Sequence, residues 1–311
     1  MHPVSRFELD DARLIVLHMK QIVQDNEVMV PIDRLSPLLE RFRVHTQLFH
    51  TGPLCGVTEF SADIGRGFLH LLRQGELELV MAGEHGGTER TTISEPSLLF
   101  LPRPTTHTFV NAPTDDSDFA CATLDFDGGS MHPLVSALPS VIVLPLAEIP
   151  ALAPALDLLF GEVDNVQCGR PILANRMFEV VLIQLLRWML DHSDQLSLPQ
   201  GVMPGLSDER LSRALVAVHE APGDPWTLES MARRSNMSRS AFAARFKEVV
   251  GRTAADYVTE WRLTIAQGEL RAGASVSAVA AELGYASASA FSRTFAQRLG
   301  ESPRAWMALQ A

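Results

Sequence analysis

An internal repeat in the C-terminal third of the chain limits the possible folds more than any other feature of the sequence. The tripeptide Ser240–Phe242 returns as Ser289–Phe291, at an offset of 49 residues. The same offset also aligns Ala232 with Ala281, Phe246 with Phe295, Val250 with Leu299, Gly251 with Gly300, Thr253 with Ser302 and Tyr257 with Trp306. Matches in a single register predict two copies of one structural unit.

Each copy has the sequence pattern of a short helix, a tight turn and a second helix. In the first copy Leu228–Ala232 predicts the short helix, Asn236 tolerates a positive φ at the turn, and Ser238 is a typical N-cap. In the second copy these roles fall to Val276–Leu283, Gly284 and Ser287. This order is typical of the helix-turn-helix unit that reads DNA.

The second helix of each copy has an apolar face and a small polar face. The apolar faces hold Phe242, Phe246 and Val249 in one copy and Phe291, Phe295 and Leu299 in the other. The opposite faces hold Ser240, Ala243, Ala244 and Lys247, and Ser289, Ser292, Arg293 and Ala296. Small polar residues beside a cation can reach base edges in a major groove. An ordinary solvent face is the alternative, and two copies in register favour DNA.

A single helix is predicted between the two copies, over Thr253–Arg271 and ending before Gly273. At about 1.5 Å per residue it would be about 28 Å long. Successive major grooves on one face of DNA lie about 34 Å apart. One rigid helix could therefore hold both readers in adjacent grooves.

The front of the chain, to about Pro145, reads as β-rich, with short apolar runs separated by glycines. Phe68–Arg73 and Glu76–Met81 flank Gly75 and predict a hairpin, and Leu98–Leu101 predicts another strand. Short strands at regular spacing predict a small β-barrel or jelly roll. The whole chain is thus expected to be α+β, with this barrel first and an all-α domain with two helix-turn-helix motifs last.

Helices are expected after Pro154, where Leu156, Leu159 and Phe160 share one helical face. A longer helix over Pro171–His192 has more apolar positions than one face needs, so we expect it to be a dimerisation segment. Ser193–Gly205 is rich in Pro and Gly and reads as a linker. The expected domains are 1–192, a linker over 193–206, and 207–311.

Charge divides the chain unevenly. The formal net charge of the 311 residues is −11. From Ser207 onward 13 Lys and Arg residues face 11 Asp and Glu residues, a net charge of +2, which leaves −13 for the front. Different partners for the two halves, or chance unevenness, would explain this. Three scattered cysteines, an acidic N-terminus and an interrupted apolar run at Val180–Leu190 predict a cytoplasmic protein with no membrane partner.

The tail resembles the AraC/XylS family of bacterial transcription regulators over about Leu211–Met307. The typical segments are Trp226–Leu228, Met237–Phe242, Phe246–Lys247, Gly284–Tyr285, Phe291–Phe295 and Gly300–Pro303. Ala244 stands where many members carry Arg, although Arg245 is adjacent, and Asn236 stands where Gly is usual. The resemblance and the helix faces together predict DNA contacts at Arg239, Ser240, Ala243, Ala244, Arg245, Lys247, Ser287, Ala288, Ser289, Ser292 and Arg293.

The front half resembles the cupin-like ligand-binding domain found in one branch of that family. The segments that carry this resemblance are Pro31–Leu35, His70–Leu72, Gly75, Leu101–Pro104 and His107, with Pro104 where Gly is usual. It implies a pocket lined by His70, His107 and Cys121. Imidazole and thiolate also suit zinc, so a metal held by these three residues is the alternative to the metal-free pocket that we expect.

The expected function is a ligand-responsive regulator that binds double-stranded DNA, senses a small-molecule effector and forms a homodimer. An activator would also contact RNA polymerase. The first alternative is a cupin-type metal-dependent enzyme with an accessory helical domain, although only part of a metal set is present and no hydrolase, P-loop or zincin motif was found. The second is an adaptor whose helical half binds protein. We expect a non-enzyme that requires no cofactor.

Overall fold

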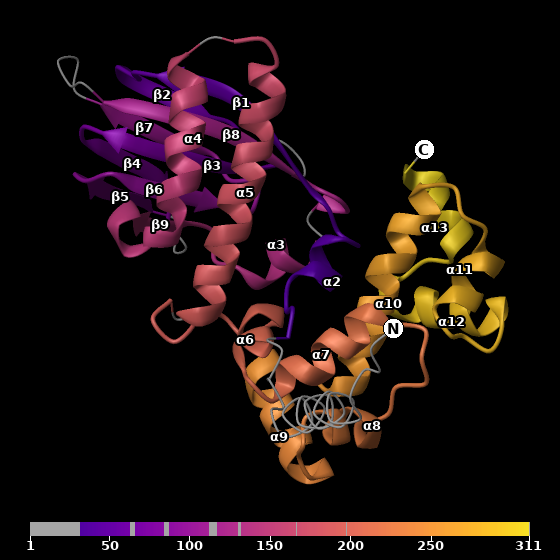
Figure 1. Ribbon diagram of the computed structural model, residues 1–311. Coiled ribbons are helices and arrows are strands. Elements are labelled where there is room, and N and C mark those ends of the chain that lie inside the picture. The colour runs from indigo at the N-terminus through magenta and orange to yellow at the C-terminus, as the bar shows by residue number, and fades with distance from the viewer. Residues whose placement is uncertain are drawn as a thin grey trace, which may run out of the picture. The chain divides into compact units, whose positions relative to one another are not determined.

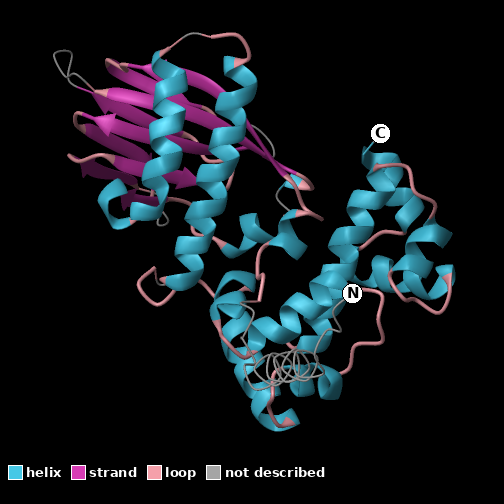
Figure 2. Ribbon diagram, in the orientation of Figure 1, coloured by secondary structure: helices cyan, strands magenta, loops and turns pink. Residues whose placement is uncertain are grey.

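The computed structural model describes residues 32–62, 66–83, 87–111, 117–129, 132–165, 167–196 and 198–310. Residues Arg34–Ala311 form one compact unit. Strands occupy the front of this unit and the tail is helical, as Figure 2 shows, so the α+β expectation is confirmed. Pro31, the first residue of the cupin resemblance, lies outside the described residues.

The strands form two antiparallel sheets that face each other. In the five-stranded sheet the order is β1 (Val44–Gly52), β8 (Asp118–Phe126), β3 (Arg66–Gln74), β6 (Ser97–Leu101) and β9 (Ile142–Pro145). In the four-stranded sheet it is β2 (Gly56–Phe60), β7 (His107–Asn111), β4 (Leu77–Ala82) and β5 (Thr88–Ile93). Buried side chains from both sheets, among them Leu79, Leu99, Phe109 and Phe119, form the core between them.

Of the predicted barrel or jelly roll, a closed barrel is not what the strands form. Within the described residues, the edge strands β1 and β9 of one sheet, and β2 and β5 of the other, each pair on one side only. The chain repeatedly passes from one sheet to the other, so neighbours in sequence are rarely neighbours in a sheet. Two facing open sheets, packed as a sandwich, are the result.

The predicted hairpin around Gly75 is also wrong. Strand β3 pairs with β6 and β8, whereas β4 pairs with β5 and β7 in the other sheet. Gly75 has a φ of 89°, and a Cβ there would lie 2.5 Å from the Cα of Ser117. The backbone therefore turns a corner between the sheets at Gly75 instead of folding back. Along β4, residues 77–81 are buried and half-buried in turn, as expected for a strand with one face in the core.

Two helices cover the outer face of the five-stranded sheet (Figure 1). They are α4 (Ala153–Asp164) and α5 (Arg170–Asp191). Asn175 of α5 receives a 2.8 Å hydrogen bond from the Leu48 N–H on β1, which fixes the helix against the sheet edge. The long helix predicted over Pro171–His192 is confirmed. Four short elements complete the front: α2 (Ser36–Leu39), α3 (Pro133–Ala137), η2 (Leu146–Glu148) and η3 (Pro150–Leu152).

The tail consists of α6 (Val202–Ser207), α7 (Leu211–Glu220), α8 (Leu228–Arg234), α9 (Arg239–Val250), α10 (Ala254–Arg271), α11 (Val276–Glu282), α12 (Ala288–Leu299) and α13 (Pro303–Gln310). Helix α6 lies within the predicted linker, and its Val202, Met203 and Leu206 are buried. The domain boundaries stay a prediction. None of the helices in the described ranges has the length and apolar character that crossing a bilayer requires.

Candidate nucleic-acid interface

The first helix-turn-helix unit is formed by α8 and α9. Thr227 and Ser230 close a capping box at the start of α8, and Asn236 has a φ of 51° at the turn. The Ser238 hydroxyl accepts a hydrogen bond from the Ala241 N–H, so it caps α9. Phe242 and Phe246 are fully buried beneath the unit. The predicted turn and cap are confirmed, and of the predicted core face Phe242 and Phe246 are buried while Val249 is half-buried.

The second unit repeats this geometry with α11 and α12. Gly284 has a φ of 72° at the turn, and a Cβ there would lie 1.9 Å from the carbonyl oxygen of Gly223. Only glycine fits both the conformation and this close approach. Ser287 caps α12 by accepting from the Ala290 N–H at 3.1 Å, and Phe291 and Phe295 are fully buried.

Helix α10 joins the two units. Its 18 residues correspond to about 27 Å at 1.5 Å per residue. Thr253 caps its start by accepting from the Asp256 N–H. In the middle, the Arg262 guanidinium donates 2.7 Å hydrogen bonds to the carbonyl oxygens of Pro222 and Asp224. These two hydrogen bonds fix the middle of α10 to the loop that precedes α8.

In the front, the structure brings together two of the three predicted pocket residues. The Nε2 atoms of His70 and His107 lie 2.9 Å apart, and both side chains are buried between the sheets. The His70 ring stacks on Phe68 and the His107 ring on Phe60. Aromatic side chains thus surround the pair.

Hydrogen bonds assign a proton position to each ring. The Nδ1 of His107 lies 2.9 Å from the carbonyl oxygen of Thr105, so it donates there, and its Nε2 accepts from His70 Nε2–H. The Nδ1 of His70 is then an acceptor without a partner. Burial lowers the pKa of His107 to about 4. Burial, and then the nearby charges of His107 and His50, lower the pKa of His70 well below its ordinary value. Both rings are neutral near pH 7.

The third predicted residue, Cys121, pairs with His70 in the register of β3 and β8. Burial raises the pKa of its thiol. A zinc site needs three or four protein ligands. In the described ranges, no three His, Cys, Asp or Glu side chains converge as such a site. The described residues do not fit zinc, and the metal-free pocket stays a prediction.

Comparison with known proteins identifies both halves. Residues 33–191, just over half of the chain, match the cupin family, and residues 231–308 match a helix-turn-helix domain family. The chain belongs to the cupin family and carries an AraC-type helix-turn-helix domain.

The relatives of this cupin protein are named as transcription regulators. It is 33% identical to the HTH-type transcriptional regulator AlkR of Acinetobacter baylyi, over 58% of this chain and 59% of the relative. It is 34% identical to a putative AraC-like transcription regulator of Streptomyces antibioticus, over 55% of this chain and 56% of the relative. It is 27% identical to the RCS-specific HTH-type transcriptional activator RclR of Escherichia coli K12, over 75% of this chain and 81% of the relative. The chain spans little more than half the length of the first two.

A solved structure also resembles the AraC-type domain. The DNA-binding domain of AdpA, determined in complex with a target DNA, is 29% identical to this chain. The match covers 33% of this chain and 93% of that domain, with a TM-score of 0.32.

Most of the predicted DNA-contact residues in the AraC-type domain lie on the exposed sides of α9 and α12. Arg239 and Arg293 are exposed, and neither pairs with another side chain in the part of the chain that the structure describes. Ser240, Ala244, Lys247, Ser287 and Ser289 are exposed, and Ala243, Ala288 and Ser292 are half-buried. Their roles as DNA contacts stay predictions.

Arg245 is held by acids on the protein itself. Its Nε donates to Asp208 at 2.9 Å, and its Nη1 lies 3.3 Å from Glu248. Burial acts to raise the pKa of Asp208, but hydrogen bonds from Leu211 N–H and Arg245 outweigh it and hold the pKa below its ordinary value. A DNA contact by Arg245 would have to break these bonds.

Sequence reasoning missed several residues on the same side of the two units. Arg233 and Arg234 end α8 and are exposed. Near α12, the missed residues Ser277, Ser302 and Arg304 line a hollow of about 430 Å³ together with the predicted Ser289 and Ser292. Helices α12 and α13 begin at this hollow, so their free N–H groups and the hydroxyls can bind an anion. Basic residues at the ends of the short helices were the signal that could have revealed part of this set.

Proposed function

We propose that this protein is a sequence-specific DNA-binding transcription regulator that places α9 and α12 in adjacent major grooves. The observation that carries the proposal is the pair of capped helices α9 and α12, which belong to the two units that α10 joins. The length of α10, about 27 Å, is comparable with the separation of about 34 Å between successive grooves. Two independent readers on one helix suit one continuous DNA site.

In this proposal two exposed arginines, one on each reader, make the strongest contacts. Arg239 at the start of α9 and Arg293 in the first half of α12 can bind a guanine edge or a phosphate. The short polar side chains beside them, Ser240 and Ser289, allow the helix backbone to approach the bases. Arg304 and the hydroxyls around it bind phosphate and set the register of α12.

Selection of genomic DNA on the purified protein tests this function. A regulator enriches a common sequence, and its affinity falls steeply as salt rises because phosphate contacts release counterions. A protein-binding adaptor would enrich no sequence. The metal-dependent enzyme gains no support, since the relatives described above are named as regulators.

We also propose that the regulator is a homodimer joined through α5. One side of α5 packs on the sheet, while Ile172, Val180 and Ile183 on the other side are 71%, 37% and 36% exposed. Leu158 of the adjacent α4 is 65% exposed. Exposed apolar residues that form one stripe favour a protein partner. Sedimentation of the full chain tests the dimer.

The same proposal places the protein in the cytoplasm, where a bacterial operator is accessible, and makes its DNA binding responsive to a small-molecule effector. The relative RclR is named an activator. If this chain is one as well, RNA polymerase is a further partner, and transcription from the selected site in a purified system would rise on addition of the protein.

A further inference from the structure

A cavity of about 420 Å³ lies beside the helix that joins the two readers. Its walls come from α3, from residues 200–202, from α10, and from the C-terminal ends of α9 and α12. The volume lies within the range of about 300–1,000 Å³ that is usual for small-molecule sites. By contrast, the space around His70 and His107 is occupied by packed phenylalanines.

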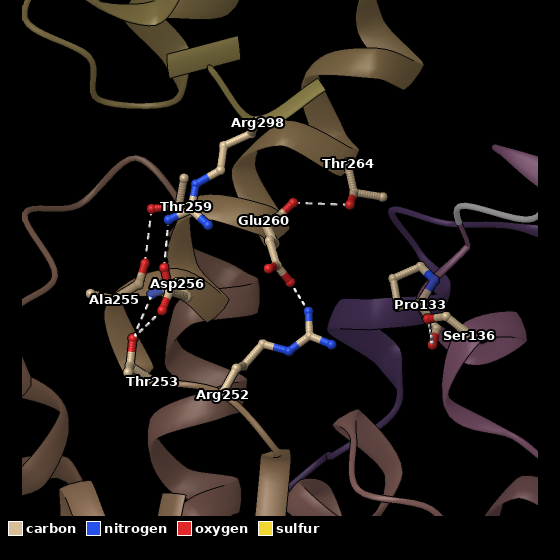
Figure 3. A network of polar contacts seen from close by, with 10 residues as sticks. All are labelled: Pro133, Ser136, Arg252, Thr253, Ala255, Asp256, Thr259, Glu260, Thr264 and Arg298. Carbon is tan, nitrogen blue, oxygen red and sulfur yellow. Dashed lines mark hydrogen bonds and ion pairs between the residues drawn. The ribbon is translucent and has the colours of Figure 1, made fainter. Parts of the chain in front are cut away.

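Two of the residues that line this cavity carry a buried polar atom without a partner. Trp261 and Gln267 line it, each only 4% exposed, and the Nε1 of Trp261 and the Oε1 of Gln267 form no hydrogen bond. An unpaired buried group costs about 1–3 kcal/mol. The hydroxyls of Ser136 and Thr264 already donate to backbone carbonyl oxygens (Figure 3). The unmet needs are thus one acceptor for Trp261 and one donor for Gln267.

The charges on the wall are already compensated. Arg252 forms an ion pair with Glu260, and Arg298 Nη2 lies 2.5 Å from Asp256 Oδ1, as Figure 3 shows. Neither guanidinium is left over to attract an anion. Much of the remaining wall is apolar, with Ala137 from α3 and Leu263 from α10 among its residues. The cavity therefore suits a neutral molecule with an apolar body.

We infer that this cavity binds a neutral, mainly apolar small molecule carrying a hydroxyl or amide group, and that this ligand controls DNA binding. The inference rests on the proposed regulator function. A hydroxyl or amide can supply the acceptor that Trp261 lacks or the donor that Gln267 lacks. The ligand would touch α3, which belongs to the cupin match, together with the helix that spaces the readers. Phe42 already contacts Trp261 there, with ring centroids 5.1 Å apart, so occupancy can be transmitted to α10 by packing.

The test uses the full-length protein and 4-ethylphenol, with ethylbenzene as the matched probe that lacks the hydroxyl. A phenol stays neutral at pH 7, since it titrates near about pH 10. Ser136 is exposed at the wall, so Ser136→Trp fills the cavity without disturbing the core. Gln267→Leu removes the side-chain hydrogen-bond acceptor and leaves a side chain of similar shape. Thr91→Trp, on the exposed strand β5, is the control for an added tryptophan.

Titration calorimetry should show saturable binding of 4-ethylphenol to the wild type and to Thr91→Trp, and weaker binding of ethylbenzene. Ser136→Trp should weaken binding at least tenfold, and Gln267→Leu by about 2- to 10-fold, the value of one neutral hydrogen bond. Saturating 4-ethylphenol should change wild-type affinity for a selected DNA fragment more than threefold, but not that of Ser136→Trp.

Failure of the site and failure of the proposed function give different results. If neither the wild type nor any variant binds a selected DNA sequence, the regulator function itself is wrong. If DNA binding is intact and the wild type does not bind 4-ethylphenol, or Ser136→Trp binds it equally well, the cavity assignment is overturned. Unchanged DNA affinity at saturating 4-ethylphenol would overturn the control of DNA binding.

Discussion

Removal of one exposed arginine from each reader should weaken DNA binding by independent amounts. Arg239 and Arg293 are exposed on different readers and bond to no other described side chain. Their loss should therefore leave the free energy of unfolding within about 0.5 kcal/mol of the wild type. Each should cost about 1–3 kcal/mol of DNA affinity, which is about 5- to 150-fold.

The geometry makes the double variant more informative than either single one. Arg239 and Arg293 lie on two different helices, α9 and α12, and share no partner among the described residues, and independent sites without shared partners contribute additively. Arg239→Ala with Arg293→Ala should thus cost about 2–6 kcal/mol. A filter-binding titration on one selected fragment, repeated at several salt concentrations, measures both the affinity and the number of phosphates neutralised. An arginine that contacts phosphate lowers the slope of log K against log salt by about 1.

Arg90→Ala is the matched control, since it removes the same charge from the strand β5, where Arg90 pairs with Glu78 at 2.8 Å. It should change DNA affinity by less than about twofold. The reasoning is refuted if both single variants bind the selected fragment as tightly as Arg90→Ala does. A double variant no weaker than the weaker single one would refute the independence of the readers.

Three further outcomes follow from burial and charge. Phe295→Ala empties a fully buried position and should cost about 3–5 kcal/mol in a urea titration; a cost below 1 kcal/mol would contradict this core. Ile172→Asp should convert the dimer to a monomer in sedimentation, whereas a dimer that persists would exclude α5 as the contact. Burial, a hydrogen bond with Glu282 and the negative charge of Glu282 raise the pKa of Glu269 from 4.5 to about 7. The positive charge of Arg41 acts to lower it. A carboxyl with a raised pKa stabilises the fold fully below about pH 4.5, and that contribution is lost as pH rises through about 7. Glu269→Gln should therefore reduce the fall in thermal stability between pH 5 and 8, and an unchanged fall would contradict the assignment.

The helix-turn-helix units were predictable because their signals are local. Asn236, Gly284 and the caps Ser238 and Ser287 act within four residues along the chain, so their roles can be read from spacing alone. The core faces of α9 and α12 follow from helical periodicity in the same way.

The errors arose where distant segments decide the structure. The strands that flank Gly75 joined different sheets because of their pairing with β6, β7 and β8, far along the chain. Arg245 is bound by Asp208, 37 residues earlier, and no local pattern reveals that pair. The cavity beside α10 is formed by segments as far apart as Pro133 and Leu299, so it was not predicted at all.

Hydroxyl-radical footprinting of the full-length protein on a selected DNA fragment tests the central claim most directly. Two capped readers on one helix should protect two patches on the same face of the duplex, separated by one helical turn of about 10–10.5 base pairs. Arg293→Ala should weaken one patch and Arg239→Ala the other. A single protected patch, or two patches on opposite faces of the duplex, would contradict the account.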